Sequence, residues 1–341
     1  MNRRTFVRLT AGAASSLVAL RAQTKAVTPR TAVVIGHTGR GNFGHGLDVT
    51  FAHRADVRVV AVSDPDEKGR AKAQDRAKAE RAYADYREML EREKPQLVGV
   101  APRWTDQHHA MVSAALAVGA HVYCEKPFTQ TLADADDLLA QARKANLKIA
   151  VAHQGRLSPD TLALKRVLDA GELGELLEIR VNGKQDRRAG GEDLMVLGTH
   201  QLDLVRYFAS AEALWCTARV LHQGRDIERA DARRSTEDLG KIAGDEIEAL
   251  FAFPRGLNVH FTSRTKNSAA AGPWGMELIG AKGRAHLLSG PRTSVRLSLH
   301  KAGGGPSGEW LPLSDPAANV DPPGVPDTLV PNRWVVDDLL A

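Results

Sequence analysis

A lysine at the end of an apolar segment is the residue of this chain best placed to do chemistry. Glu125-Lys126-Pro127 follows the apolar run at 120–124, about 90 residues after a glycine-rich turn that begins at Gly36. In open α/β sheets, ligands bind beyond the carboxyl ends of the strands, where this pattern places Lys126. A partly desolvated ammonium has a lowered pKa and can exchange a proton with a ligand hydroxyl. A surface lysine paired with Glu125 is the structural alternative, and tight packing of Pro127 would require a cis Lys126–Pro127 bond.

A second polar cluster is Gly198-Thr199-His200-Gln201-Leu202-Asp203. On a helix His200 and Asp203 share a face, so the carboxylate could orient the imidazole or bind a ligand. A lone histidine is more often a satisfied polar residue than a catalyst. Arg156 falls where the chain would cross between domains, and there a structural ion pair is as plausible as substrate binding.

The glycine-rich turn, Gly36-His37-Thr38-Gly39-Arg40-Gly41, lies between a predicted strand and a predicted helix, as a dinucleotide fingerprint does. The fingerprint asks for glycine at its third place, where this chain has Thr38. Gly39 could supply the space for a pyrophosphate instead, or the Thr38 hydroxyl could bind a phosphate. A plain tight turn is the alternative.

Asp64 ends the second predicted strand, 28 residues after Gly36. An acid at this position can accept hydrogen bonds from the adenosine ribose and repels a 2′-phosphate, which favours NAD over NADP. Arg40 and Lys68 could soften that repulsion. The alternative is that Asp64 caps a helix with Pro65 in its first turn.

Strands and helices alternate over the first half of the chain and predict a doubly wound parallel sheet. The predicted strands are 31–36, 57–62, 96–101, 120–124 and 148–152, and the predicted helices are 47–53, 67–82, 86–93, 106–118 and 132–146.

The rhythm changes after residue 152, where a second, α+β domain with a large, open, mainly antiparallel sheet is predicted. Its predicted helices are 161–170 and 194–208, and its predicted strands are 176–181, 215–221, 246–253, 257–263, 276–279, 285–288 and 295–299. We therefore divide the chain into a targeting segment and linker (1–30), a Rossmann domain (31–152) and a substrate and oligomerisation domain (153–341). The chain stops within an apparent amphipathic helix, so the last domain is expected to be truncated.

The basic residues are concentrated at the N-terminus. Residues 1–30 hold six basic residues and no acidic ones, and the rest of the chain has a net charge of about −1, which removes the electrostatic support for nucleic-acid binding. The pattern Arg3-Arg4-Thr5-Phe6 before a short apolar stretch is typical of a twin-arginine signal, although a disordered basic tail is the alternative. We expect export to the periplasm or beyond and no membrane segment in the mature form.

The remaining reactive residue types give weaker signals. Cys124 and Cys216 each lie in an apolar run, which indicates small buried side chains, with a disulfide as the alternative in an oxidising compartment. Without clustered histidines the two cysteines predict no metal site. His108 and His109 open a predicted helix, and one of them could point into a cleft.

Together these motifs resemble the Gfo/Idh/MocA family, named for glucose–fructose oxidoreductase and inositol dehydrogenase. The resemblance runs from about Thr31 to Leu299 and includes Val62-Ser63-Asp64-Pro65, Pro102 with His108, and the Glu125-Lys126-Pro127 and Gly198–Asp203 clusters. It implies hydride transfer between a sugar or cyclitol carbinol and NAD(P), with Lys126 contacting the reacting hydroxyl and His200 as acid and base. Within that picture Gly36, Thr38, Gly39, Arg40, Gly41, Asp64, Pro102, His108, Glu125 and Lys126 would surround the cofactor, and Arg156 and Asp203 the substrate.

The resemblance also implies a homo-oligomer assembled through the second sheet. One departure stands out: inositol dehydrogenases use an aspartate four residues before the histidine, where this chain has Val196, while Glu192 and Asp193 are out of phase. Export would require the enzyme to hold its dinucleotide tightly. The competing predictions are a redox-neutral, NAD-dependent glycoside hydrolase and a non-catalytic carbohydrate-binding protein.

Overall fold

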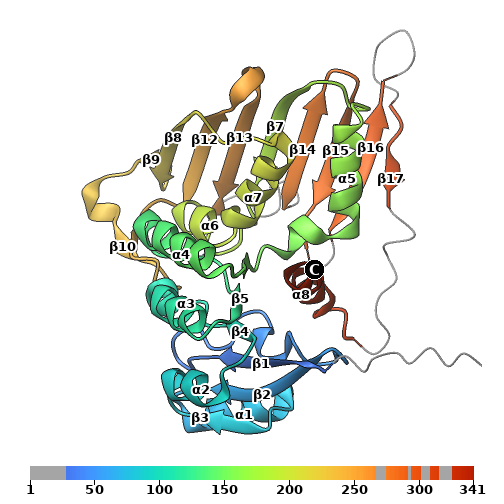
Figure 1. The fold of residues 1–341 in the computed structure, drawn as a ribbon. Helices are drawn as coiled ribbons and strands as arrows, with labels where there is room; N and C mark the ends of the chain where they lie inside the picture. The colour runs from blue at the N-terminus through green and yellow to red at the C-terminus, as the bar shows by residue number, and fades with distance from the viewer. Residues whose placement is uncertain (1–27, 266–273, 291–292, 301–307, 315–324) are drawn as a thin grey trace, which may run out of the picture.

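The computed structural model describes residues 28–265, 274–290, 293–300, 308–314 and 325–341. They form two parts, a parallel sheet with its helices and a large open sheet above it (Figure 1). This confirms the predicted fold class. Residues 1–27 of the predicted targeting segment and linker (1–30) lie outside the described residues, and Arg30 already begins β1. Within the described residues no helix is long and apolar enough to cross a membrane.

The lower sheet has six strands in the order β3-β2-β1-β4-β5-β6, and every neighbouring pair is parallel. Its central strands are buried on both faces, which explains their near-continuous runs of valine and alanine. The strand order reverses between β1 and β4, so the ligand crevice of this fold lies beyond their carboxyl ends. The strands are β1 (Arg30–Ile35), β2 (Val57–Ser63), β3 (Arg81–Tyr83), β4 (Leu97–Val100), β5 (His121–Cys124) and β6 (Ile149–Val151).

Helices cover both faces of this sheet. One apolar cluster packs α1, the η1 turn and the C-terminal helix α8 on one face, and a second packs α2, α3 and α4 on the other. The helices begin at side-chain caps where the sequence offers them, as at Asp66, Asp85 and Thr131. The bounds are α1 (Glu67–Ala77), α2 (Tyr86–Glu93), α3 (His108–Ala117), α4 (Leu132–Ala145), α8 (Val330–Leu340), η1 (Leu47–Val49) and η2 (Thr105–Gln107).

Two predicted helices of this half are wrong in extent. The helix expected at 47–53 is only the 3-10 turn η1, because Gly44 and Gly46 before it adopt positive φ angles. The helix expected to reach residue 82 ends at Ala77, where Lys78 turns left-handed, and the chain then adds the unpredicted edge strand β3. The cap of α1 is Asp66, so Asp64 is not the helix cap that the sequence offered as an alternative.

The upper sheet has nine strands in the order β17-β16-β15-β14-β7-β13-β12-β8-β9. Only β7 and β13 pair in parallel, so the sheet is mainly antiparallel as predicted. The strands are β7 (Leu176–Asn182), β8 (Trp215–His222), β9 (Arg225–Asp226), β12 (Glu246–Ala252), β13 (Asn258–Arg264), β14 (Gly275–Gly280), β15 (Gly283–Leu288), β16 (Ser294–Leu299) and β17 (Leu311–Leu313); a separate ribbon pairs β10 (Arg233–Arg234) with β11 (Lys241–Ile242).

Helices α5 (Pro159–Asp169), α6 (Gly191–Val196) and α7 (Gly198–Ala209) lie on the lower side of this sheet (Figure 1) and share its apolar core. The single helix predicted at 194–208 is therefore two helices separated at Leu197. This break leaves the last carbonyl groups of α6 free to accept hydrogen bonds from elsewhere. The other short turns are η3 (Gln154–Leu157), η4 (Arg229–Asp231) and η5 (Pro254–Gly256).

Helix α8 returns to the lower part of the molecule. Val335, Val336 and Leu339 join the apolar cluster of the parallel sheet, and the Tyr123 hydroxyl donates to Asn332 at 2.8 Å. Helix α8 therefore packs against the Rossmann part although it follows the second sheet in sequence. The predicted domain boundary at residue 152 remains a prediction.

Candidate active site

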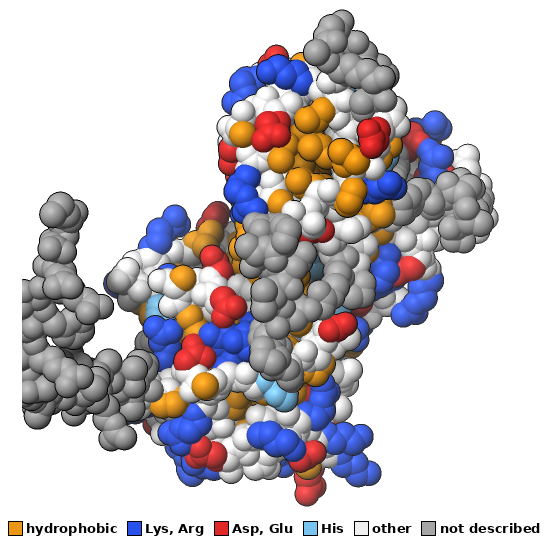
Figure 2. All heavy atoms as spheres, turned by 90° about the vertical axis from the view of Figure 1, so that its right-hand side faces the viewer, with side chains coloured by type: hydrophobic (Ala, Val, Ile, Leu, Met, Phe, Trp, Pro, Cys, Tyr) orange, Lys and Arg blue, Asp and Glu red, His pale blue; other side chains and the backbone are white. Residues whose placement is uncertain are grey.

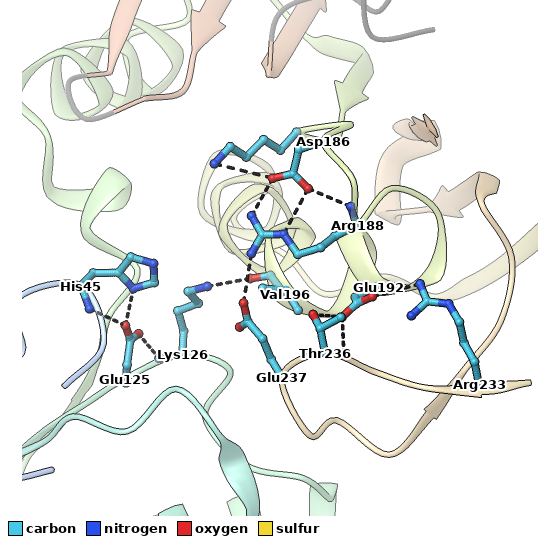
Figure 3. A network of polar contacts seen from close by, with 11 residues as sticks. His45, Glu125, Lys126, Asp186, Arg188, Glu192, Val196, Arg233, Thr236 and Glu237 are labelled. Atoms are coloured by element: carbon cyan, nitrogen blue, oxygen red, sulfur yellow. Dashed lines mark hydrogen bonds and ion pairs between the residues drawn. The ribbon is translucent and has the colours of Figure 1, made fainter. Parts of the chain in front are cut away.

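Lys126 lies directly beyond β5, and the Lys126–Pro127 bond is cis, as predicted. The side chain is 1% exposed, and its ammonium donates to the Val196 carbonyl oxygen at 3.0 Å (Figure 3). Burial lowers the pKa of Lys126, against the attraction of Glu125 and Glu237. The break after α6 thus supplies the partner of Lys126, at the position where the inositol dehydrogenases would carry an aspartate.

Glu125 connects this lysine to the loop after β1. Its fully buried carboxylate accepts from the Lys126 backbone N–H at 2.6 Å, from the His45 backbone N–H at 3.1 Å and from His45 Nδ1. Burial alone would raise the pKa of Glu125, but His45 and Lys126 hold it below its ordinary value. Glu125 is therefore an anchoring carboxylate rather than a surface partner of the Lys126 side chain.

His200 lies in the first turn of α7, beside residues from three other segments. Its ring stands edge-on to His153, with centroids 5.3 Å apart, and to Trp274, with centroids 6.1 Å apart. Burial, and then the positive groups of His153 and Lys126, put the pKa of His200 well below 6.5. The imidazole is therefore neutral at pH 7 and able to accept a proton.

His200 faces a cavity of about 440 Å³ between the two parts of the molecule, which we call the site cavity. Two buried polar atoms on its wall, His153 Nε2 and Trp274 Nε1, have no hydrogen-bond partner among the described residues. Buried polar groups are nearly always paired, so these two atoms indicate a polar ligand. The lining residues are His45, His153, Gln154, Gly155, Arg156, Lys184, Leu197, His200, Leu204, Trp274, Ser289, Gly290, Thr293, Thr328, Pro331, Asn332 and Trp334.

Lys126 and His200 both lie near the junction between the two parts of the molecule. Lys126 is bound to Val196, two residues before α7 begins, and its charge reaches both His153 and His200. Lys126 itself is buried behind the wall, while His45, which binds its neighbour Glu125, reaches the site cavity. His200 lines the site cavity and Lys126 does not, so the joint action of the two groups on one substrate hydroxyl remains a prediction.

Arg156 and Asp203 bind each other. The guanidinium Nε donates to Asp203 Oδ2 at 2.9 Å, and a second nitrogen contacts Oδ1. Asp203 also lies 3.8 Å from His153 Nδ1, but the structure places no contact between Asp203 and His200. Arg156 lines the cavity as part of an ion pair, the structural alternative that the sequence left open, and Asp203 does not orient His200.

The carboxylates near Val196 face away from the site cavity. Glu192 accepts from Arg233 and Thr236, and Asp193 accepts from Ser263 and from the Gln185 backbone (Figure 3 for Glu192). Neither replaces the aspartate that Val196 displaces, so the predicted departure from the inositol dehydrogenase pattern stands.

The loop after β1, residues 36–46, has most of its polar groups bound internally; we call it the β1 loop. Gly39 has φ +86°, and a Cβ there would meet nothing within 4 Å, so it has the open space that the sequence assigned to it. Gly36 and Gly41 differ: a Cβ on Gly36 would strike the Phe43 ring, and one on Gly41 would strike the backbone at Arg103. The loop is closed onto the segment after β4 at Gly41 and open at Gly39.

Thr38 and Asp64 are committed to each other. The Thr38 hydroxyl donates to Asp64 at 2.7 Å, its backbone N–H donates at 3.0 Å, and the Asp66 N–H donates at 2.9 Å. Asp64 is 0% exposed. In this structure the Thr38 hydroxyl and the Asp64 carboxylate bind each other, and their roles toward phosphate and ribose, with the preference for NAD over NADP, stay predictions.

The remaining predicted cofactor residues are also bound within the protein. Arg40 pairs with Asp106 across the crevice. His108 is fully buried, with Nε2 2.7 Å from the Pro102 carbonyl and Nδ1 2.9 Å from the Phe128 carbonyl. His108 thus connects the segments after β4 and β5 and does not point into a cleft.

Of the residues that line the site cavity, the sequence predicted Arg156 and His200 and missed the others, including His45, His153, Lys184, Trp274 and Trp334. His153 begins the stretch that contained Arg156, and that proximity was the one available signal. The others come from loops and from α8, which follow no motif. Cys124 is buried as predicted, but Cys216 is exposed, and both are free. Among the described residues no cluster of histidine, cysteine and acidic side chains could hold a metal ion.

The backbone at Gly39 leaves space for a dinucleotide, whereas Thr38 and Asp64 are hydrogen-bonded to each other. Gly39 leaves the open approach that a pyrophosphate needs, and the site cavity lies beyond β1, β5 and β6, near where a nicotinamide would lie in this fold. The β1 loop backbone around Gly39 and the cavity wall at His45 fit such a group, whereas Thr38 and Asp64 would first have to exchange partners.

Comparison with known proteins supports the same fold. The model of the Gfo/Idh/MocA oxidoreductase family, NAD-binding Rossmann fold, matches residues 30–153, and the Gfo/Idh/MocA C-terminal domain model matches residues 161–286. Myo-inositol 2-dehydrogenase of Thermotoga maritima is 24% identical over 276 residues, which cover 77% of this chain and 78% of the relative.

Two solved structures share the fold at low identity. An inositol dehydrogenase homologue from Azotobacter vinelandii complexed with NAD⁺ has a TM-score of 0.70 at 18% identity, over 92% of this chain and 86% of that one. Levoglucosan dehydrogenase in complex with NADH and levoglucosan has a TM-score of 0.70 at 17% identity, over 92% of this chain and 89% of that one. With both family models matched along the chain, the protein belongs to the Gfo/Idh/MocA family of oxidoreductases and carries its NAD-binding Rossmann fold.

Proposed function

We propose that the protein oxidises a secondary hydroxyl of a polyhydroxylated ring, a sugar or a cyclitol, with NAD as the hydride acceptor. The observation that carries the proposal is the neutral, buried His200 imidazole on the wall of a polar cavity beyond the carboxyl ends of the Rossmann strands. The relatives named as inositol and levoglucosan dehydrogenases support the substrate class.

His200, Trp274 and Lys126 have different roles in the proposed reaction. His200 takes the proton that leaves the substrate hydroxyl as the carbonyl forms. The flat face of Trp274 and the unpartnered nitrogens of the wall hold the ring, since aromatic faces and donors suit polyols. The nicotinamide, when bound, accepts the hydride from the carbinol carbon. Lys126 stays bound to Val196 behind the wall and places a positive charge near the oxygen on which negative charge develops.

Two finer features of the proposal rest on other observations. The twin-arginine pattern supports export, and an exported enzyme would have to retain its dinucleotide between turnovers. A homo-oligomer is supported by exposed Leu299 and Leu311 on neighbouring strands at one edge of the upper sheet. Seen from that side, hydrophobic side chains gather on the upper part of the molecule, whereas on the lower part they are interspersed with charged side chains (Figure 2).

Mass spectrometry of the small molecules released from denatured protein tests the cofactor. We expect NAD⁺ or NADH after expression in the cytoplasm, and protein that binds neither during purification nor after incubation would contradict the proposal. Turnover is then measured as NADH formation with a panel of sugars and cyclitols. Release of nitrophenol from nitrophenyl glycosides without net NADH would instead identify redox-neutral glycoside hydrolysis.

A further inference from the structure

The charges around the site cavity are of one sign. None of its described lining residues is acidic, while Arg156, Lys184 and three histidines are among them. Carboxylates beside the wall are already bound: Glu125 by His45, Asp203 by Arg156 and Asp186 by Arg188. A site for a neutral polyol normally offers carboxylates that accept from the hydroxyl groups, and this wall offers mostly donors.

Lys184 is the less tightly held of the two described lysine and arginine side chains on this wall. Arg156 is held in two contacts by Asp203, whereas the Lys184 ammonium lies 3.8 Å from Asp186, beyond hydrogen-bonding distance. Asp186 is itself bound by Arg188, with one contact at 2.6 Å, and this pairing lowers the pKa of Asp186 to about 2. Asp186 is therefore an ionised carboxylate that binds Arg188 directly and holds Lys184 only through the longer ion pair.

The position of Lys184 suits a ligand group at the end of the cavity. Its ammonium lies 5.7 Å from the centroid of the Trp274 ring, whose buried Nε1–H has no partner among the described residues. An ammonium and an indole N–H on the same wall can bind the two oxygens of a carboxylate that lies between them. The same positive field acts on His200, where His153, Lys126, His45 and Lys184 all favour the neutral imidazole.

We propose that the substrate is a sugar carboxylate, whose carboxylate group binds Lys184 and the Trp274 N–H while its ring faces His200. The proposal rests on the proposed function and names the substrate class of the same site. A carboxylate fits better than a phosphate because the wall offers one ammonium and its arginine is committed to Asp203, whereas phosphate recognition favours several cations or a free arginine fork.

Binding to the NADH-loaded protein tests this independently of turnover. Isothermal titration is carried out with three pairs of probes, glucuronate with glucose, galacturonate with galactose and mannuronate with mannose, and with glucose 6-phosphate. We expect at least one uronate to bind about tenfold to a hundredfold more tightly than its neutral parent, the range for a charge-assisted hydrogen bond. Lys184→Met should remove this preference and leave the affinity for the neutral sugar unchanged.

The matched control is Lys144→Met, which removes an exposed lysine from α4 and should preserve the preference. The inference is overturned if every neutral sugar binds as tightly as its uronate, if Lys184→Met weakens both members of a pair equally, or if glucose 6-phosphate binds more tightly than all uronates. NADH formation with a neutral sugar alone would leave the proposed function standing and reject this inference. Selective uronate binding without any hydride transfer would do the reverse.

Discussion

The β1 loop and the site cavity both lie at the carboxyl ends of the parallel strands, but they treat their polar groups in opposite ways. In the β1 loop, Thr38 and Asp64 bind each other and Arg40 binds Asp106. In the site cavity, the buried nitrogens of His153 and Trp274 have no partner among the described residues.

This difference separates polar groups that stabilise the fold from polar groups that are available to bind a ligand. A buried polar atom without a partner costs free energy, so it persists where a bound molecule supplies the partner. The sequence motif indicated the β1 loop as a cofactor site because its glycines resemble a dinucleotide-binding fingerprint. The site cavity is the stronger candidate because its unpartnered nitrogens lie on the wall of a cavity that a ligand can enter, although Arg40 Nε and Asp106 Oδ1 near the β1 loop also have no partner among the described residues.

The largest expected effect comes from the cavity side. His200→Gln should lower kcat by about 10²- to 10⁴-fold, because a glutamine of similar size cannot accept the hydroxyl proton. It should leave the melting temperature close to that of the wild type. The measurement is the initial rate of NADH formation with the substrate identified in the turnover assay.

His109→Gln is the matched control, because His109 lies on α3 and binds Asp137 outside the cavity. If His200→Gln retains more than a tenth of wild-type kcat, His200 is not the base that accepts the hydroxyl proton. The main evidence that the site cavity is catalytic would then be lost.

The sequence predicted the fold better than it predicted the site. Valine-rich runs and glycine-separated hairpins are local signals, and they placed twelve of the fifteen described strands of the two sheets, missing the short strands β3, β9 and β17. Lys126 and His200 were found because they end a strand and begin a helix. The site also depends on which loops meet after folding, and local patterns do not record that: His45, Trp274 and α8 converge from distant parts of the chain. The same limit applies to Asp64. The sequence placed it correctly at the end of β2 but did not predict its hydrogen bond with Thr38.

The next effect tests the β1 loop. Asp64→Asn should lower the free energy of unfolding by about 1–3 kcal/mol, because an amide cannot accept all the bonds that Thr38 and Asp66 donate to the buried carboxylate. Urea denaturation of the ligand-free protein measures it. Asp75→Asn, at an exposed acid of α1 that pairs only with Lys78, is the control and should change stability by less than about 0.5 kcal/mol.

A ribose-binding role for Asp64 predicts the opposite pattern. The variant would then keep its stability and lose affinity for NAD, or accept NADP, and that result would move Asp64 from the structural group to the ligand-binding group.

The smallest expected effect is a pH dependence of stability that arises on the cavity side. Burial lowers the pKa values of both His153 and His200, so below about pH 6.5 the unfolded chain binds protons that the folded chain does not. Stability should therefore fall as the pH falls from 7.5 to 5.5, a range above most carboxylate titrations. His200→Gln should reduce that loss by up to about 1 kcal/mol, measured as urea midpoints at the two pH values, whereas Lys144→Met should not. Equal losses in the wild type and in His200→Gln would mean that His200 is protonated in the folded state, and a protonated imidazole could not take the hydroxyl proton.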